Sequence, residues 1–183
     1  MAEIQPHIPD LHTALKWLQA EYKVKVLESY EDKVNSAYKG KKVGYLVVKN
    51  GTVFLMRFRR NVMNFNSHYP GAPRGLGFGC NRSELERQMN GILIRRMGIV
   101  VDNVWTMVVR PDMKVYIASP WEIKAFVRQY NTTKGLFRKS IPDEDEDIFN
   151  VPFRLFFNFD KWLSGEQTQS DYEWRETFAE ART

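Results

Sequence analysis

Hydrophobic and polar side chains alternate most clearly between Lys42 and Arg60, in the stretch KVGYLVVKNGTVFLMRFRR. The Asn50-Gly51 pair within it predicts a tight β-hairpin turn, because both residues tolerate positive φ. Successive side chains of a strand point to opposite faces of its sheet. The second strand is therefore expected to place Val53, Leu55, Arg57 and Arg59 on one face, and Phe54, Met56 and Phe58 on the other.

Two arginines at the end of a strand that is apolar on both faces indicate a site. Burying a charge without a partner is costly, and a guanidinium group offers a bidentate fork to phosphate oxygens. We interpret Arg57 and Arg59 as contacts for an anionic ligand. The alternative is that they form internal ion pairs with acids such as Glu28 or Glu21.

The spacing of apolar residues elsewhere predicts further elements. A helical period and capping residues predict helices over 10–22, from Ser83 to about Met97, and from Ser119 to about Tyr130. Alternation predicts strands over 23–29, 103–110 and 113–118. This order of helices and strands implies an α/β fold with a mixed central sheet flanked by helices. We expect one domain over 1–163, followed by a polar C-terminal tail or terminal helix over 164–183.

The interval 61–81 is rich in glycine and is expected to form a long, ligand-facing loop, with a disordered excursion as the alternative. It combines Arg74 with the aromatic residues Phe65, Tyr69 and Phe78. Aromatic side chains can stack on unpaired bases, while glycines let the backbone approach phosphate. Packing of this loop against its own domain is the alternative. A second loop, the acidic run 143–147, is interpreted as a solvated turn, with a Mg²⁺-binding carboxylate cluster as the alternative.

The distribution of charge along the chain indicates which class of ligand the protein binds. The chain of 183 residues has a net charge of +5, but residues 33–96 hold thirteen Lys/Arg against two acids, and residues 141–183 hold four against eleven. A basic middle segment with a balance of +11 (13 − 2) indicates a face that binds polyanions such as DNA or RNA. The candidate phosphate contacts are Arg57, Arg59, Arg60, Lys41, Lys42, Lys49, Arg74, Arg87 and Arg95.

The sequence gives little indication of a disulfide-bonded, zinc-binding, membrane-spanning or secreted protein. A single cysteine, Cys80, allows no internal disulfide and no paired zinc ligands. No run of 18 apolar residues is present, so no membrane span is expected. The first twelve residues lack the apolar core of a signal peptide. We therefore expect a cytoplasmic protein.

The order helix, strand, Asn-Gly hairpin, helix, strand over about Asp10–Tyr130 resembles the PD-(D/E)XK nucleases, with the archaeal Holliday-junction resolvases as the nearest likeness. The resemblance implies a restriction-endonuclease-like fold and, by analogy, a homodimer. In that family an aspartate on the first hairpin strand and Glu-x-Lys on the second hold a divalent metal and assist the attacking water. Aligning the turns places Gly44, Arg57 and Arg59 at those three positions.

A hard divalent cation such as Mg²⁺ requires oxygen ligands, normally carboxylates, which two guanidinium groups do not supply. The sequence therefore predicts a nuclease-like protein that binds nucleic acid through phosphate contacts and does not cut it, with no cofactor. The first alternative is a Mg²⁺-dependent nuclease with relocated carboxylates from Glu28, Asp32 or Glu84. The second is a module that binds a protein partner through its acidic C-terminal part and its aromatic residues.

Overall fold

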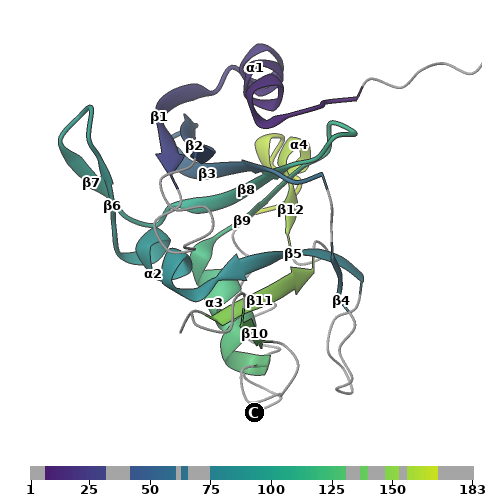
Figure 1. Ribbon diagram of the computed structural model, residues 1–183. Helices are drawn as coiled ribbons and strands as arrows, with labels where there is room; N and C mark the ends of the chain where they lie inside the picture. Colours follow the sequence, from purple (N-terminus) through teal and green to yellow (C-terminus); the bar gives the residue numbers. More distant parts are fainter. Residues whose placement is uncertain are drawn as a thin grey trace, which may run out of the picture.

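The computed structural model describes residues 7–31, 42–60, 63–65, 75–130, 137–139, 147–152 and 156–168. A six-stranded sheet forms its centre, in the order β1-β2-β3-β8-β9-β12 (Figure 1). These strands are β1 (Lys25–Glu31), β2 (Lys42–Lys49), β3 (Thr52–Phe58), β8 (Trp105–Val109), β9 (Val115–Ala118) and β12 (Phe157–Asn158). All neighbours are antiparallel except β3 and β8, which are parallel. The chain must therefore cross over between these two strands.

Helices cover both faces of this sheet (Figure 1). α1 (Leu11–Tyr22) and α4 (Phe159–Leu163) lie on one face. The crossover between β3 and β8 contains α2 (Arg82–Asn90), which lies on the other face beside α3 (Pro120–Tyr130). The predicted α/β class, with a mixed central sheet flanked by helices, is confirmed.

The two faces of β3 build two separate cores, as the alternation predicted. Phe54 and Met56 are fully buried in the core beneath α1 and α4, where the Phe54 ring meets those of Phe159 and Trp162 edge-on. Leu55 is buried in the opposite core. That second core also contains Tyr30, Leu46, Ile92, Ile94 and Val104.

The turn and two of the helix caps follow their sequence signals. Asn50 and Gly51 adopt φ values of 51° and 77° in the hairpin between β2 and β3. Asp10 Oδ1 accepts a hydrogen bond from the Thr13 amide at 2.8 Å at the start of α1. Ser119 Oγ accepts hydrogen bonds from two amides in the first turn of α3, each at 3.2 Å. These side chains satisfy amides that a helix start leaves without partners.

The prediction of one helix from Ser83 to about Met97 is wrong. α2 begins one residue earlier, so Ser83 lies inside its first turn, and it ends at Asn90. Gly91 has φ of +155°, a conformation that residues with a Cβ rarely adopt, and it separates α2 from a β-ribbon. The ribbon consists of β6 (Ile92–Ile94) and β7 (Ile99–Val101), which pair antiparallel. Pairing with β7 has overridden the helical spacing of the apolar residues.

The prediction of a continuous loop over 61–81 is also wrong where the structure describes that interval. β4 (Met63–Phe65) and β5 (Gly75–Asn81) belong to a second sheet, in the order β10-β11-β5-β4. Its other strands are β10 (Phe137–Lys139) and β11 (Asp147–Pro152). Tyr69, Arg74 and residues 143–146 of the acidic run lie outside the described residues, as does 169–183 of the expected tail.

Within the described part of the chain, no helix is long and apolar enough to cross a membrane.

A hydrogen bond joins the two helices on the first face of the sheet. The Tyr22 hydroxyl at the end of α1 donates to Asp160 Oδ1 of α4 at 2.7 Å. Burial raises the pKa of Tyr22 above its usual value, and the hydrogen bond to Asp160 and the charge of that carboxylate raise it further. The neutral phenol is therefore the form that the folded protein prefers.

Replacing Tyr22 by Phe is expected to lower the free energy of unfolding by about 0.5–1.5 kcal/mol at pH 7, the usual contribution of one hydrogen bond. Because the folded-state pKa is raised, this contribution is complete below about pH 10, the pKa of an unperturbed tyrosine, and declines at higher pH. Urea unfolding of both proteins at pH 7 and pH 10.5 measures the difference. An equal difference at both pH values would contradict the assignment.

Candidate functional site

Three residues form a row across β1, β2 and β3, at the place where the sequence predicted a site. Tyr30 pairs with Gly44 in the β1–β2 ladder. Gly44 in turn lies against Arg57 of β3, whose Cγ is 3.4 Å from the position that a Cβ on residue 44 would occupy. α2 covers this row on the face of the second core. The row brings one of the two predicted arginines next to a tyrosine that the prediction did not include.

Arg57 is engaged inside the protein. It is only 8% exposed, and its Nη2 atom donates to Glu84 Oε2 of α2, a residue that is 5% exposed. The internal ion pair that the sequence left open is therefore present for Arg57, but its partner is Glu84 and not Glu28 or Glu21. A buried, paired guanidinium is not presented to an external phosphate, so we assign Arg57 a structural role.

Gly44 is packed too closely for any side chain. A Cβ at this position would lie 2.3 Å from the Met56 carbonyl oxygen, a backbone atom that cannot move aside without shifting β3. The resemblance to nucleases places a metal-binding aspartate here. In this chain the backbone of β3 occupies the space where such a side chain would begin.

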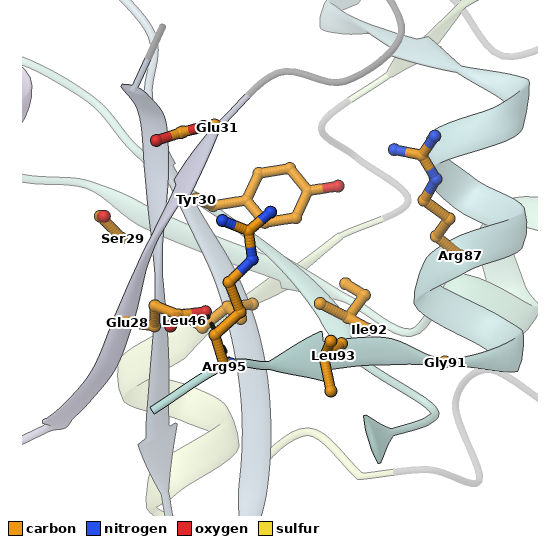
Figure 2. Close-up of a pocket in the computed structure, with 10 residues that line it drawn as sticks. All are labelled: Glu28, Ser29, Tyr30, Glu31, Leu46, Arg87, Gly91, Ile92, Leu93 and Arg95. Carbon is orange, nitrogen blue, oxygen red and sulfur yellow. Dashed lines mark hydrogen bonds between the residues drawn. The ribbon is translucent and has the colours of Figure 1, made fainter. Parts of the chain in front are cut away.

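A pocket of about 360 Å³ opens beside the row, between β1, β2, the end of α2 and β6 (Figure 2). A volume of this size lies within the range of small-ligand sites. Its lining combines apolar residues with two arginines, two glutamates and a tyrosine. The lining residues are Glu28, Ser29, Tyr30, Glu31, Leu46, Arg87, Gly91, Ile92, Leu93 and Arg95.

Two buried polar groups face each other across this pocket. Tyr30 is 4% exposed, and its hydroxyl points toward the Arg87 guanidinium (Figure 2). The two groups do not close a hydrogen bond of normal geometry, and neither the Tyr30 hydroxyl nor Arg87 Nη1 has another partner in the described chain. Burial raises the pKa of Tyr30, and the charge of Glu84 raises it further, while Arg87 and Arg57 oppose the shift. The hydroxyl is thus a neutral hydrogen-bond donor at physiological pH.

The two carboxylates of the pocket differ in their surroundings. Glu28 accepts hydrogen bonds from the backbone amides of Arg95 and Arg96, each at 3.3 Å. These contacts fix the start of the β6–β7 turn against β1 and direct the Glu28 charge toward amide donors. Glu31 is exposed at the end of β1, and its carboxylate points away from the Tyr30 ring (Figure 2).

The other basic candidates that the structure describes lie at several places in the fold. Lys42 is exposed, with its ammonium group 5.3 Å from the centre of the Tyr45 ring, which belongs to the core on the opposite face. Arg60 donates a hydrogen bond to the Pro9 carbonyl beside the start of α1. Arg59 is half-buried beyond β3, and Lys49 adjoins the hairpin turn. Among the described basic candidates, Arg87 and Arg95 line the pocket.

Three candidates from the sequence, Lys41, Arg74 and Asp32, lie outside the described residues. Tyr30 was not predicted as a site residue, and Glu84 was predicted only as an alternative metal ligand, not as the partner of Arg57. Glu84 was interpreted as part of a capping box, although its spacing of three from Arg87 places both on one side of a helix. Tyr30 was missed because β1 extends two residues beyond the predicted strand.

Among the described residues, no group of three or more His, Cys, Asp or Glu side chains is arranged to hold a metal ion. Comparison of the chain with protein-family models, with curated proteins and with solved structures found no match.

Replacing Glu84 by Gln is expected to lower the free energy of unfolding by about 3–5 kcal/mol, because Arg57 would remain buried without its counter-charge. The double variant Arg57→Met/Glu84→Leu removes both charges and is expected to recover most of that loss. Urea unfolding of the three proteins measures both effects. A single variant no less stable than the double variant would show that solvent screens the pair.

Replacing Gly44 by Ala is expected to cost at least about 1–3 kcal/mol, the usual range for overpacking, because the new methyl group must displace the β3 backbone. Gly44→Asp is expected to destabilise further and to produce no Mg²⁺-dependent cleavage of DNA. Thermal unfolding and a plasmid-nicking assay test the two statements. A stable Gly44→Asp variant would contradict the close packing between β2 and β3.

Proposed function

We propose that this protein binds nucleic acid through a phosphate contact in the pocket between β1, α2 and β6, on a nuclease-like scaffold that does not cut its ligand. The observation that carries the proposal is the pair of buried donors, the Tyr30 hydroxyl and Arg87 Nη1, that face this pocket without a partner in the described chain. Burying unsatisfied donors costs free energy. A ligand with several acceptor oxygens removes that cost.

A phosphate group fits these donors best. Arginine binds phosphate through parallel N–H donors, and a neutral tyrosine hydroxyl supplies a further donor to a third oxygen. Arg95 lines the same pocket, and the exposed Arg96 follows it. These cations lie in the basic segment 33–96, which favours a polyanion over an isolated phosphate.

The order of elements supports the nuclease-like scaffold. α1 precedes the three antiparallel strands β1, β2 and β3. After β4 and β5, α2 leads through the β6–β7 ribbon to β8, which is parallel to β3. The same order of helix, strand, hairpin, helix and strand underlies the resemblance to PD-(D/E)XK nucleases.

Binding is favoured over the cutting alternative by the contacts of Glu28 and Glu84, the two candidate acids that the structure describes. Glu84 pairs with Arg57, and Glu28 accepts from the amides of Arg95 and Arg96. A carboxylate already engaged by cationic or amide donors is a poor ligand for Mg²⁺, because binding the ion requires that these contacts be broken.

Affinity for duplex DNA should therefore fall with salt concentration. If Arg87, Arg95 and Arg96 each neutralise one phosphate, the logarithm of the affinity falls with the logarithm of salt at a slope of about −2.7. Replacing Arg95 by Ala is expected to reduce the steepness by about 0.9. Fluorescence anisotropy of a labelled duplex over 50–200 mM salt measures the slope.

The Tyr30→Phe variant distinguishes an effect on nucleic-acid affinity from an effect on the stability of the free protein. Removing a hydroxyl that lacks a partner is expected to leave the stability of the free protein unchanged or slightly higher. Losing its hydrogen bond to a charged phosphate is expected to weaken binding about tenfold or more.

The matched control is Lys16→Ala, which removes an exposed cation from α1 on the opposite face of the sheet and should change neither the affinity nor the slope. Two results would overturn the proposal. One is no binding of single-stranded or duplex nucleic acid at low salt. The other is a Tyr30→Phe variant that binds as well as the unaltered protein.

A further inference from the structure

The β6–β7 ribbon has one face built into the protein and one face open to solvent. Ile92 and Ile94 of β6 are buried in the second core. Leu93 and Val100 form the cross-strand pair on the other face and are 55% and 65% exposed. The ribbon lies at the periphery of the molecule (Figure 1), and the start of its turn is held against β1, the edge strand of the central sheet. An apolar pair so exposed on a peripheral ribbon indicates a binding surface.

The turn of this ribbon is basic and preformed. All residues from Arg95 to Val100 are exposed. The Ile94 carbonyl accepts hydrogen bonds from the amides of Met97 and Gly98, at 3.2 Å and 2.9 Å. Glu28 holds the amides of the two arginines from the side of β1. Because the backbone of the turn is already ordered, little conformational entropy is lost when a ligand binds.

Two kinds of side chain on the ribbon select its ligand. The arginine pair at the turn favours an anionic partner, whereas Leu93, Met97 and Val100 require apolar contacts. The major groove of DNA offers both, since guanine presents two acceptors that match a guanidinium and thymine presents a methyl group. Phosphates line the edges of that groove.

We infer that the ligand is B-form duplex DNA, with the ribbon turn in the major groove and a flanking phosphate in the pocket. The inference rests on the proposed function, because it uses the same phosphate contact at Tyr30 and Arg87. Leu93 and Arg95 connect the two parts, since they belong to the ribbon and also line the pocket. A phosphate bound there therefore places the ribbon beside the groove that this phosphate borders.

The dimensions of the ribbon agree with those of the groove. Two paired strands are about 4.8 Å apart, and a three-residue strand is about 10 Å long. The major groove of B-form DNA is about 12 Å wide and about 8.5 Å deep, and it admits a two-stranded ribbon. In A-form RNA the major groove is narrow and deep, and protein side chains cannot read it. The ribbon therefore distinguishes duplex DNA from duplex RNA.

The test compares three labelled probes of one sequence, a 16-base-pair DNA duplex, the equivalent RNA duplex and the single DNA strand, by fluorescence anisotropy. The unaltered protein is expected to bind the DNA duplex at least about tenfold more tightly than the RNA duplex. Met97→Ser/Val100→Ser changes two exposed apolar residues that do not line the pocket, and it is expected to remove most of this preference and to retain binding to the single strand. Replacing thymine by uracil in the DNA duplex should weaken binding to the unaltered protein but not to the serine variant.

Two controls accompany these variants. Trp121→Ser replaces an exposed apolar residue on α3 and should leave the preference unchanged. Sedimentation at the protein concentrations used for binding reports the oligomeric state of each variant.

The outcomes separate this inference from the proposed function. Equal affinity for all three probes that still depends on Tyr30 would overturn the inference and leave the proposed function standing. A serine variant that changes from dimer to monomer without a change in DNA preference would also overturn it, because the ribbon would then bind a second copy of the chain. Failure to bind any probe would overturn both.

Discussion

The buried ion pair between Arg57 and Glu84 determines where α2 lies on the sheet. A guanidinium on the inner face of β3 must have a counter-charge, because an unpaired buried charge is prohibitively costly. The carboxylate that supplies it comes from α2, so the helix cannot slide or rotate without breaking the pair. Gln88 adds two hydrogen bonds from the same helix, from its Nε2 to the Val104 carbonyl at 3.1 Å and to Thr106 Oγ1 at 2.9 Å. Polar contacts thus fix both the position of α2 along the sheet and its rotation about its own axis.

The position of α2 determines the rest of the candidate site. Arg87 lies one turn beyond Glu84, so a helix anchored at Glu84 presents Arg87 beside Tyr30. Gly91 then ends the helix, and a Cβ at that residue would lie 2.7 Å from Val100 Cγ1. The absence of a side chain at Gly91 therefore lets β7 fold back over the end of α2. The pocket and the β6–β7 ribbon therefore both depend on the position of α2.

Local rules were sufficient for the hairpin, the two faces of β3 and the caps at Asp10 and Ser119, because a turn or cap depends on residues adjacent in sequence. They failed where pairing between strands decides the structure. The residues after Gly91, which were expected to continue the helix to about Met97, form the local β6–β7 hairpin, and the glycine-rich 75–81 pairs with the distant β11 as β5. The partner of Arg57 was also missed, since Glu84 is 27 residues away. No local pattern identifies which acid reaches a buried arginine.

The ion pair also bears on whether this region binds a metal cation or a phosphate. A metal-dependent nuclease requires free carboxylates that converge on one point. The electrostatic potential at that point is therefore negative before the metal ion binds. On the nuclease-like scaffold that we propose, the row aligned with those ligands contains a closed backbone contact at Gly44 and an arginine neutralised by Glu84. The buried groups that line the pocket without a partner in the described chain are the Tyr30 hydroxyl and Arg87 Nη1, which are donors, and they lie in the same lining as the carboxylates of Glu28 and Glu31. Donors in a buried site attract acceptor oxygens, and so the same arrangement that disfavours a cation at this row favours a phosphate beside it.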